Sequence, residues 1–422
     1  MKTIAYFLSY LLIRVLLLPF SLLSQKHLHK VGEKIGIFCF PFLTKYRKRA
    51  LSNLALATDL SLTPEEIEFF AKKSLGNLFI TALEYGKFSN LKRINSIATC
   101  INPEQADLFI KEGKGVIFFC SHQANWEVFF LEGSSRMAGI AIGQPIKNPF
   151  LYGWILRMRQ QFGGTIIEPK QAVKEGLRAL KKGHFLGIVG DQGMPEAGFC
   201  SPFLGRLAWT SPLPALLAYR SKAPIIVATM TRQLGKYFIH YSPPIFADPL
   251  KKAEEEIPRL MKESIHFLEE SIRKKPEEWL WQHNKWKQQG PGKIKRPYRQ
   301  DTIAIVLPQS SCDLEPLLPH LDTFRKDLYP SEFLTFFIPE GICLPPELHA
   351  EVKTYKSYEE IKTKDYRFKL LFNFTADQSI SDYFMKLAVF HTLSLQELAK
   401  LAGPLKEPSL SNQLKKVLLY AS

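Results

Sequence analysis

The order of apolar and polar residues predicts a long apolar segment at the start of the chain, followed by alternating strands and helices. Residues 4–23 are almost entirely apolar, and about twenty residues at helical rise are enough to span the hydrocarbon core of a membrane. Further on, short apolar runs alternate with segments whose apolar residues recur every three or four positions. That alternation indicates an α/β sheet with helices on both faces.

A helix start precedes the first of the periodic segments. Thr63 is expected to cap the helix, Pro64 suits its first position, and Glu66 completes a capping box. The patterns that follow predict strands at residues 116–120, 140–143, 165–167, 185–189, 225–229 and 237–241, and helices at residues 151–161, 172–182, 211–220 and 253–272.

The stretch at residues 288–299 is polar, basic and rich in Gly and Pro, and it is typical of a linker. Beyond it we predict a second, smaller α/β unit of Rossmann-like type. Because it carries no recognised motif, the default expectation is a scaffold or a partner-docking module. The elements expected there are strands at 303–307, 334–338 and 368–374, and helices at 314–328, 382–391 and 395–401. The resulting division is a membrane anchor at 1–25, a main α/β domain at 26–290, a linker at 291–300 and the small domain at 301–422.

We expect the first segment to attach the protein to a membrane. Arg14, near its middle, costs about 2.5–3.5 kcal/mol on insertion scales, which the surrounding leucines offset, and Pro19 is expected to kink or end the helix. A basic flank follows at residues 26–49, so the body is predicted to lie on the cytoplasmic side. The alternatives are a helix lying in the membrane interface and a buried helix of a soluble protein.

The distribution of charge limits the kinds of binding partner to expect, and the spacing of the cysteines bears on disulfide bonds and metal sites. The formal charge is +16, but residues 301–422 hold 13 basic against 16 acidic residues, so the excess lies in the first 300 residues. A basic body suits an anionic membrane surface, a phosphorylated ligand or an acidic carrier protein. No nucleic-acid partner is expected, because the chain lacks the known binding signatures. The six cysteines form no C-x-x-C pair, which predicts neither a disulfide framework nor a metal site.

Candidate chemistry follows the first predicted strand, in the sequence VIFFCSHQANWEVFF at residues 116–130. His122 and Glu127 are five residues apart, about 500° around a continuous helix, so they can meet only if His122 stands on the turn before the helix. Glu127 is then expected to hold one ring nitrogen and raise the basicity of the other. Backbone N–H groups at the helix start are candidates for stabilising an oxyanion. The alternative is that His122 merely caps the helix.

These residues also carry a family resemblance. H-x-x-x-x-E resembles the H-x-x-x-x-D/E signature of glycerolipid acyltransferases, and its Ser-His and Trp-Glu pairs look like those of the late lipid A acyltransferases. Blocks that agree in order are RKRALSNL at 47–54, NPFLYGWILRMR at 148–159, GIVGDQ at 187–192 and PEEWLWQHNKWK at 276–287. The similarity covers roughly residues 4–295. The chain departs from it in its C-terminal unit and in Ser121, where relatives often have Asn or Gly.

The resemblance implies a glycerolipid-acyltransferase-like fold for residues 26–290 and a location at the inner membrane. It implies transfer of a fatty-acyl chain from acyl carrier protein, or alternatively coenzyme A, to a hydroxyl of a phosphorylated lipid A precursor, without cofactor or metal. His122 is the expected general base with Glu127 as its partner, and Arg159, Asp191 and Arg157 are expected to bind substrate.

Structural alternatives stand beside each of these roles: a solvated helix arginine for Arg159, a turn cap for Asp191, and core or membrane-interface packing for the tryptophans at 279, 281 and 286. The rival functions are acylation of a lysophospholipid such as lysophosphatidic acid, and a catalytically silent membrane adaptor.

Overall fold

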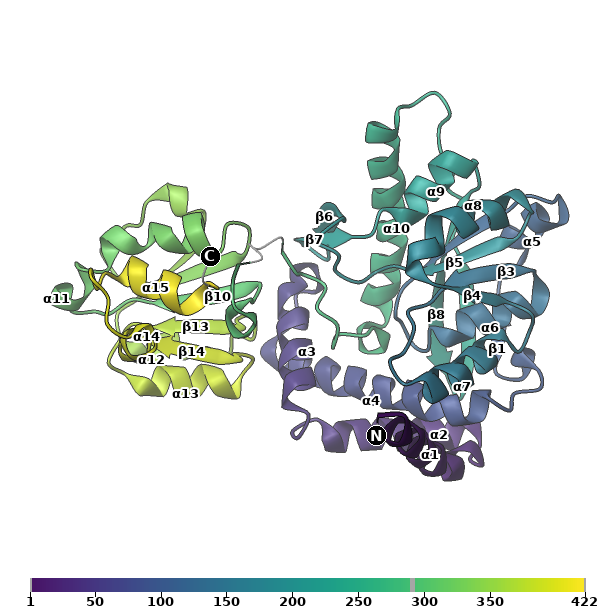
Figure 1. Ribbon diagram of the computed structural model, residues 1–422, viewed down its shortest axis with the longest axis horizontal. Helices are drawn as coiled ribbons and strands as arrows, with labels where there is room; N and C mark the ends of the chain where they lie inside the picture. The colour runs from purple at the N-terminus through teal and green to yellow at the C-terminus, as the bar shows by residue number, and fades with distance from the viewer. Residues whose placement is uncertain (1, 289–292, 421–422) are drawn as a thin grey trace. The chain divides into compact units, whose positions relative to one another are not determined.

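The computed structural model describes residues 2–288 and 293–420, which form two compact units (Figure 1). The first unit comprises residues 2–42, 69–204 and 210–281. The second comprises residues 43–68, 205–209, 282–288 and 293–420. The division at residues 25, 290 and 300 stays a prediction, and residues 289–292 of the expected linker lie outside the described residues.

A seven-stranded sheet forms the centre of the first unit and confirms the α/β class. Its order is β1-β9-β8-β2-β5-β3-β4, and every neighbouring pair is parallel except β8 with β9. The continuous apolar run of β2 is buried at all five positions, because other strands flank it on both sides and helices cover both faces. The strands are β1 (Ala98–Cys100), β2 (Val116–Cys120), β3 (Gly139–Ile142), β4 (Thr165–Ile167), β5 (Phe185–Val189), β8 (Ile225–Gln233) and β9 (Lys236–Tyr241).

The helices of this unit pack in two groups. α9 contacts both α8 and α10, and α6 contacts α7. Val116, Phe118 and Cys120, alternate residues of β2, join the core that α5, α6 and α7 help to form. The helices are α4 (Pro64–Phe88), α5 (Glu104–Lys111), α6 (Glu127–Arg136), α7 (Pro149–Gln160), α8 (Ala172–Lys181), α9 (Leu213–Ser221) and α10 (Ala253–Lys274). The capping box that begins α4 is confirmed, since the backbone N–H groups of Thr63 and Glu66 each donate to the other side chain.

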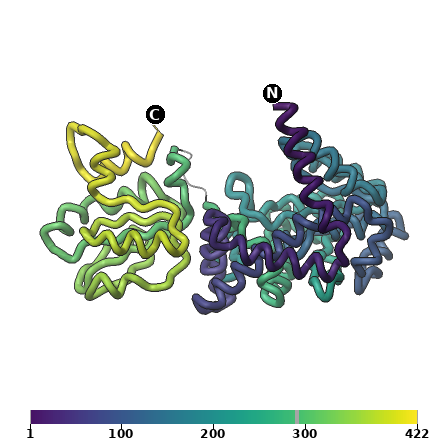
Figure 2. Tube along the Cα trace, turned by 90° about the horizontal axis from the view of Figure 1, so that it is seen from below, coloured from purple at the N-terminus to yellow at the C-terminus, as the bar shows by residue number. Residues whose placement is uncertain are grey.

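The chain begins with α1 (Lys2–Ser21), which is long and apolar enough to cross a membrane (Figure 2). Arg14 lies over the ring of Trp154 at 4.9 Å and donates to the hydroxyl of Tyr10 at 3.0 Å. Its charge therefore faces protein, while large apolar side chains occupy the exposed face of the helix. This placement explains how an apolar helix tolerates Arg14. The ring of Trp154 and the hydroxyl of Tyr10, together with the leucines, offset the free-energy cost of placing its charge in an apolar helix. Pro19 lies inside the last turn of α1.

Two further helices, α2 (Gln25–Cys39) and α3 (Thr44–Leu56), follow α1. By its contacts α3 belongs to the second unit, where Lys48 Nζ donates to Val389 O and Ser52 Oγ donates to Arg367 O at 2.7 Å. Residues 47–54, which resemble a family block, are therefore part of this helix.

The second unit contains a five-stranded parallel sheet and confirms the predicted Rossmann-like type. Its strand order is β12-β11-β10-β13-β14. Taken in chain order this is 3-2-1-4-5, the doubly wound arrangement in which the direction of winding reverses beside the first strand. The strands are β10 (Thr302–Val306), β11 (Phe333–Pro339), β12 (Glu351–Tyr355), β13 (Leu370–Asn373) and β14 (His391–Ser394).

Two predicted helices of this unit are wrong in extent. Residues 314–328 form α11 (Ser311–Leu314) and separate turns at Leu318–His320 and Phe324–Leu328, because Pro316 and Pro319 interrupt a continuous helix. The helix expected at 382–391 is α13 (Gln378–Lys386), which starts earlier because Asp377 caps it. His391 instead begins β14, paired with β13.

Other elements were not predicted from sequence. They include the strands β1, β12, β14, β6 (Phe199–Phe203) and β7 (Arg206–Thr210), and the helices α2, α5, α12 (Tyr358–Ile361) and α15 (Leu410–Leu418). α14 (Leu395–Ala402) matches the predicted helix closely. Next to α15, Ile294 is buried and the N–H of Lys295 donates to Leu418 O, so residues 293–295 are packed on the end of the chain.

A buried ion pair stabilises the second unit. Lys369 and Asp301 are 2% and 3% exposed, and Lys369 Nζ lies 2.8 Å from Asp301 Oδ1. Asn284 contributes at both ends, since its Nδ2 donates to Asp301 at 2.6 Å and its Oδ1 accepts from Lys369. A buried charge is tolerated only with such partners, because the interior does not solvate it.

We predict that Asp301→Ala lowers the free energy of unfolding by about 3–5 kcal/mol, because it leaves the ammonium of Lys369 buried without its counter-ion. The matched control is Asp322→Ala, which removes the partner of Lys326 in an exposed pair and is expected to change stability little. Urea unfolding of both variants, followed by circular dichroism, measures the difference. Equal effects in the two variants would contradict a special role for the buried pair.

Candidate active site

The turn after β2 is fixed by a segment from much later in the chain. Gln123 and Trp279 form an antiparallel bridge, and the N–H of Leu280 donates to His122 O at 3.0 Å. The N–H of Ala124 donates to Glu278 O at 2.7 Å. Ala124 has φ +49°, a conformation that L residues adopt only when the surroundings impose it. The first part of the Trp-rich segment at 276–287 therefore fixes the backbone of this turn by hydrogen bonds.

His122 stands on this turn as predicted, but a different carboxylate from the expected one holds its ring. Nδ1 lies 2.6 Å from Asp191 Oδ1, and the backbone N–H of His122 donates to Asp191 Oδ2 at 2.9 Å. Asp191 follows β5, the parallel neighbour of β2, and carboxyl ends of neighbouring parallel strands meet at one edge of a sheet. Asp191 thus takes the geometric place that the sequence analysis gave to Glu127.

The protonation state of Asp191 defines the tautomer of His122. Burial raises the pKa of Asp191, but the charge and hydrogen bonds of His122, with a 2.7 Å hydrogen bond from Trp279 Nε1, outweigh it and lower the pKa to about 2. Ionised Asp191 can only accept, so Nδ1 carries a proton and Nε2 is free of one in the neutral ring. Consistently, the side-chain amide nitrogen of Gln192 lies 3.1 Å from Nε2.

Glu127 forms a second cluster at the start of α6. Arg159 of α7 donates to it through Nε at 2.7 Å and Nη2 at 2.6 Å, and Tyr85 donates its hydroxyl at 2.6 Å. Such a fork is among the strongest contacts between charged side chains. Burial and the adjacent Glu127 charge raise the pKa of Tyr85 well above its ordinary value. Burial lowers the pKa of Arg159, but Glu127 more than compensates, so the net change is upward.

This cluster changes the expectation for the two arginines. The guanidinium of Arg159 is engaged by Glu127 and is 17% exposed, which indicates a role in orienting that carboxylate. Arg157, two positions earlier, is exposed on another face of α7. The structure therefore joins His122 with Asp191 and Glu127 with Arg159. The catalytic or substrate-binding role of each residue stays a prediction.

The expected oxyanion donors are partly occupied. The N–H of Glu127 donates to Asn125 Oδ1 at 3.1 Å, and the N–H of Val128 donates to Asn125 O at 3.0 Å. These two groups at the start of α6 are thus already satisfied by the turn itself. Asn125 serves as a side-chain cap one residue ahead of the N-cap position, Trp126.

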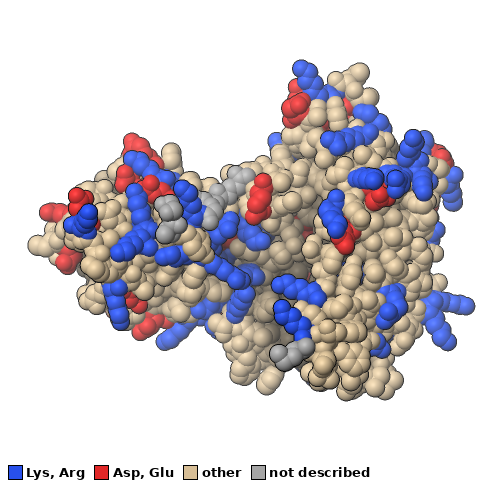
Figure 3. Space-filling view, in the orientation of Figure 1, with Lys and Arg blue, Asp and Glu red and all other residues tan. Residues whose placement is uncertain are grey.

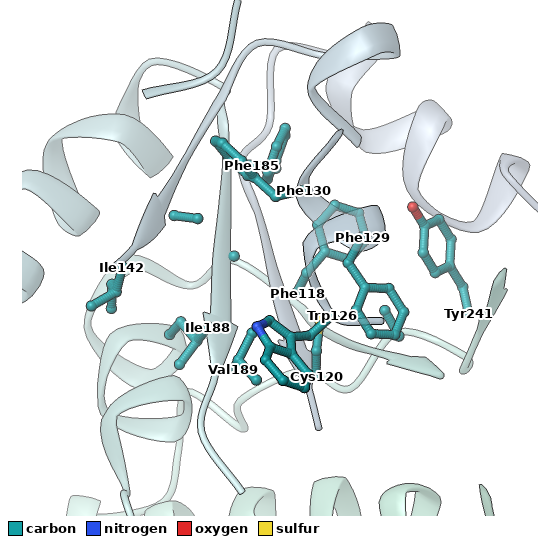
Figure 4. Close-up of a pocket in the computed structure, with 13 residues that line it drawn as sticks. Phe118, Cys120, Trp126, Phe129, Phe130, Ile142, Phe185, Ile188, Val189 and Tyr241 are labelled. Carbon is teal, nitrogen blue, oxygen red and sulfur yellow. The ribbon is translucent and has the colours of Figure 1, made fainter. Parts of the chain in front are cut away.

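An apolar pocket (Figure 4) is connected to His122 through Trp126. The rings of His122 and Trp126 are 4.9 Å apart, and Trp126 is one of the residues that line the pocket. Phe118, Phe130 and Phe185 line it (Figure 4). The small residues Ala141 and Gly187 also belong to its lining. Its empty volume, part of it open to solvent, is about 440 Å³. Its lining suits an alkyl chain, since apolar walls exclude water from apolar ligands.

Sequence reasoning missed three partners of these site residues: Trp279, Gln192 and Tyr85. Trp279 was interpreted as core or membrane packing, yet its indole N–H reaches Asp191. Gln192 directly follows a predicted site residue, which is the one signal that pointed to it. Tyr85 lies on α4, a helix whose start was predicted from the sequence but on which no site residue was expected.

A buried carboxylate that holds one nitrogen of a histidine, at the edge of a sheet and beside an apolar pocket, is an arrangement suited to moving protons next to an alkyl-bearing substrate. The sequence of residues 1–288 matches the family of bacterial lipid A biosynthesis acyltransferases. The chain belongs to this family, and the protein is an acyltransferase.

No curated protein matches the chain. Among solved structures, the chain is similar to the 1-acyl-sn-glycerophosphate acyltransferase of Thermotoga maritima, at 14% sequence identity and a TM-score of 0.26, over 53% of this chain and 98% of that one.

We predict that Asp191→Asn reduces turnover by about 10³–10⁴-fold, because an amide no longer fixes the tautomer of His122 or stabilises the imidazolium. The matched control is Asp107→Asn, which alters a carboxylate paired with Arg136 away from His122. Steady-state kinetics of both variants provide the measurement, and an Asn variant with wild-type turnover would show that Asp191 has no such role.

The ionisation of Asp191 also contributes to stability. Its pKa in the folded chain, about 2, lies below the ordinary value of 3.8. The stabilisation is therefore fully present above pH 3.8 and is lost as the pH falls through about 2.

Proposed function

We propose that the protein transfers a fatty-acyl chain from the thioester of acyl carrier protein to a hydroxyl of a phosphorylated lipid A precursor. The observation that carries this proposal is the hydrogen-bonded pair of His122 and Asp191 next to an apolar pocket. Membership of the family supports the lipid A precursor as acceptor. The pocket supports an alkyl chain as the transferred group.

His122 acts as general base in this mechanism. Nε2 removes the proton of the acceptor hydroxyl, which enters where the amide of Gln192 now lies, and the oxygen attacks the thioester carbon. When the carbon–sulfur bond breaks, the imidazolium returns the proton to the departing thiolate. Asp191 keeps Nδ1 protonated throughout and stabilises the imidazolium by its negative charge. Transfer is direct and needs no covalent acyl-enzyme.

We keep Glu127 as a residue of the site, but as an orienting residue and not as the partner of the His122 ring. Its carboxylate, held by Arg159 and Tyr85, stands at the start of α6 five residues after the base. We assign Glu127 and Arg159 to one orienting pair at the edge of the site, and we place Arg157 among the residues that meet the acceptor.

The donor is assigned by charge. Lys and Arg side chains are spread over the face of the molecule shown in Figure 3, and the first 300 residues carry the excess positive charge of the chain. An acidic carrier protein associates faster with such a surface than a neutral partner does. Coenzyme A is the alternative donor.

The membrane supplies the acceptor and holds the enzyme. The exposed face of α1 is apolar, and exposed lysines at 26, 30 and 34 follow on α2. We propose that α1 anchors the protein in the inner membrane with the α/β body on the cytoplasmic side, because basic flanks remain on that side.

We predict that His122→Ala abolishes acyl transfer to a tetraacylated lipid A precursor that bears Kdo. The assay uses detergent-solubilised enzyme and radiolabelled acyl–carrier protein, with lysophosphatidic acid as a second acceptor in parallel. His266→Ala is the matched control, because this histidine is exposed on α10 away from the site.

The outcomes separate the candidate functions. Labelling of the lipid A precursor alone, dependent on His122, supports the proposal. Labelling of lysophosphatidic acid alone would retain the chemistry and replace the acceptor. Failure of the folded wild type to label either acceptor would favour the silent adaptor.

A second prediction concerns acyl-chain length. Ala141→Leu adds three carbons to the wall of the pocket and is expected to shift preference toward shorter donors. Each methylene that no longer fits forfeits about 0.8 kcal/mol, or about fourfold in kcat/KM. Ala138→Leu, an exposed position before β3, is the matched control. Competition between donors of different chain length provides the measurement, and an unchanged preference would remove this pocket from the acyl path.

A further inference from the structure

One face of α4 carries polar side chains, and successive residues along this face contact different parts of the turn around His122. Ser74, Asn77, Thr81 and Glu84 are all buried and recur every three or four positions, so they lie on one face of the helix. Buried polar side chains persist where hydrogen bonds compensate their loss of water. We call this set the α4 polar stripe.

The first three members donate hydrogen bonds to the backbone of the turn and of residues 278–279, which we call the closing segment. Ser74 Oγ donates to Trp279 O at 2.6 Å. Asn77 Nδ2 donates to Ala124 O at 3.1 Å and to Glu278 O at 3.0 Å, and Thr81 Oγ1 donates to Ala124 O at 3.0 Å. These bonds hold Ala124 in its left-handed conformation from one side, while the segment at 278–280 holds it from the other.

Glu84 acts on the turn through Asn125. Asn125 Nδ2 donates to Glu84 Oε2 at 2.7 Å, and Asn125 Oδ1 accepts from the N–H of Glu127 at 3.1 Å. Since Glu84 Oε2 accepts this hydrogen bond, the contact selects the orientation in which the amide nitrogen of Asn125 faces Glu84. That choice leaves the amide oxygen to cap α6 and thereby sets where Glu127 begins the helix.

The carboxylate is itself fixed from three directions. Tyr237 donates its hydroxyl to Oε2 at 2.6 Å, His29 Nε2 lies 2.7 Å from Oε1, and Gln25 also donates to Oε1. Glu84 therefore cannot turn away from Asn125 without breaking contacts to β9 and α2. A group held this way has the rigidity that supporting residues of an active site require.

We propose that Glu84 is a positioning residue for acyl transfer, which acts through Asn125 on the turn that carries His122 and Glu127. The inference rests on the proposed function for its kinetic readout. It adds to that function a residue that touches no substrate and lies on a different helix from the reacting groups.

The principal test is Glu84→Gln. This substitution keeps the size of the side chain but replaces a group that only accepts hydrogen bonds by an amide that also donates them. We expect kcat to fall about 100-fold with the KM for the acyl donor within about twofold, because a small displacement of reacting groups has that effect on rate. Glu256→Gln changes another buried carboxylate, on α10, and is the matched control for stability. Unchanged kcat in folded Glu84→Gln, or an equal loss in Glu256→Gln, would overturn the proposal.

A double-mutant cycle distinguishes positioning from general support. If Glu84 acts through Asn125, Glu84→Gln adds at most about twofold to the loss already caused by Asn125→Ala. Independent, multiplying losses would show that Glu84 does not work through Asn125.

Two further measurements keep the test decisive. Hydrogen exchange of the Glu127 amide in Glu84→Gln should be faster than in wild type, and this readout stands even if the wild type fails to acylate the proposed acceptor. Unchanged exchange would overturn the proposal. Should Glu84→Gln not fold, Thr81→Val is expected to lower kcat while Thr81→Ser restores it, and equal activity of the two would remove the α4 polar stripe from the mechanism.

Discussion

The negative charge of Asp191 has to be balanced inside the protein, because its side chain is 1% exposed. Asp191 follows β5, and the groups that balance its charge come from two other places: the ring and backbone of His122 after β2, and the indole of Trp279 after α10. Each of them is useful only when the others are present. The sheet, the turn and the closing segment therefore form one cooperative assembly around a single ionised carboxylate, and the tautomer of His122 follows from it.

The sequence predicted the position of the site better than its connections. A buried apolar run followed by Ser-His is local information, so the strand, the turn and His122 were predictable. The partner of the ring was not, because pairing of β2 with β5 joins residues about seventy positions apart, and spacing along the chain favoured the nearer Glu127. Asp191 was recognised as a site residue through resemblance, although its contact with His122 depends on the strand order.

The same distinction explains the fold. β2 and β5, in the middle of the seven-stranded sheet, have continuous apolar runs and were predicted to the residue, whereas β8 extends four residues beyond its predicted end. β1 and β12 lie at the ends of their sheets, and their mixed sequences show less of a strand pattern. In the second unit, the apolar residues at 314–328 resemble a helix, but two prolines divide them into turns. The polar face of α4 was not predicted, because the partners of its Ser, Asn, Thr and Glu side chains lie far away in the sequence.

The bridge between Gln123 and Trp279 has a consequence for biosynthesis. A ribosome delivers the chain from its N-terminus, so the strand and turn that carry His122 emerge long before the segment that secures them. Until residues 278–280 have been made, Ala124 is held only by α4, and Asp191 lacks its indole partner. Contacts between distant parts of a chain form late in folding. A nascent molecule therefore passes through a stage at which its sheet is largely synthesised but its chemistry is not yet assembled, and the enzyme becomes competent only near the end of its acyltransferase region.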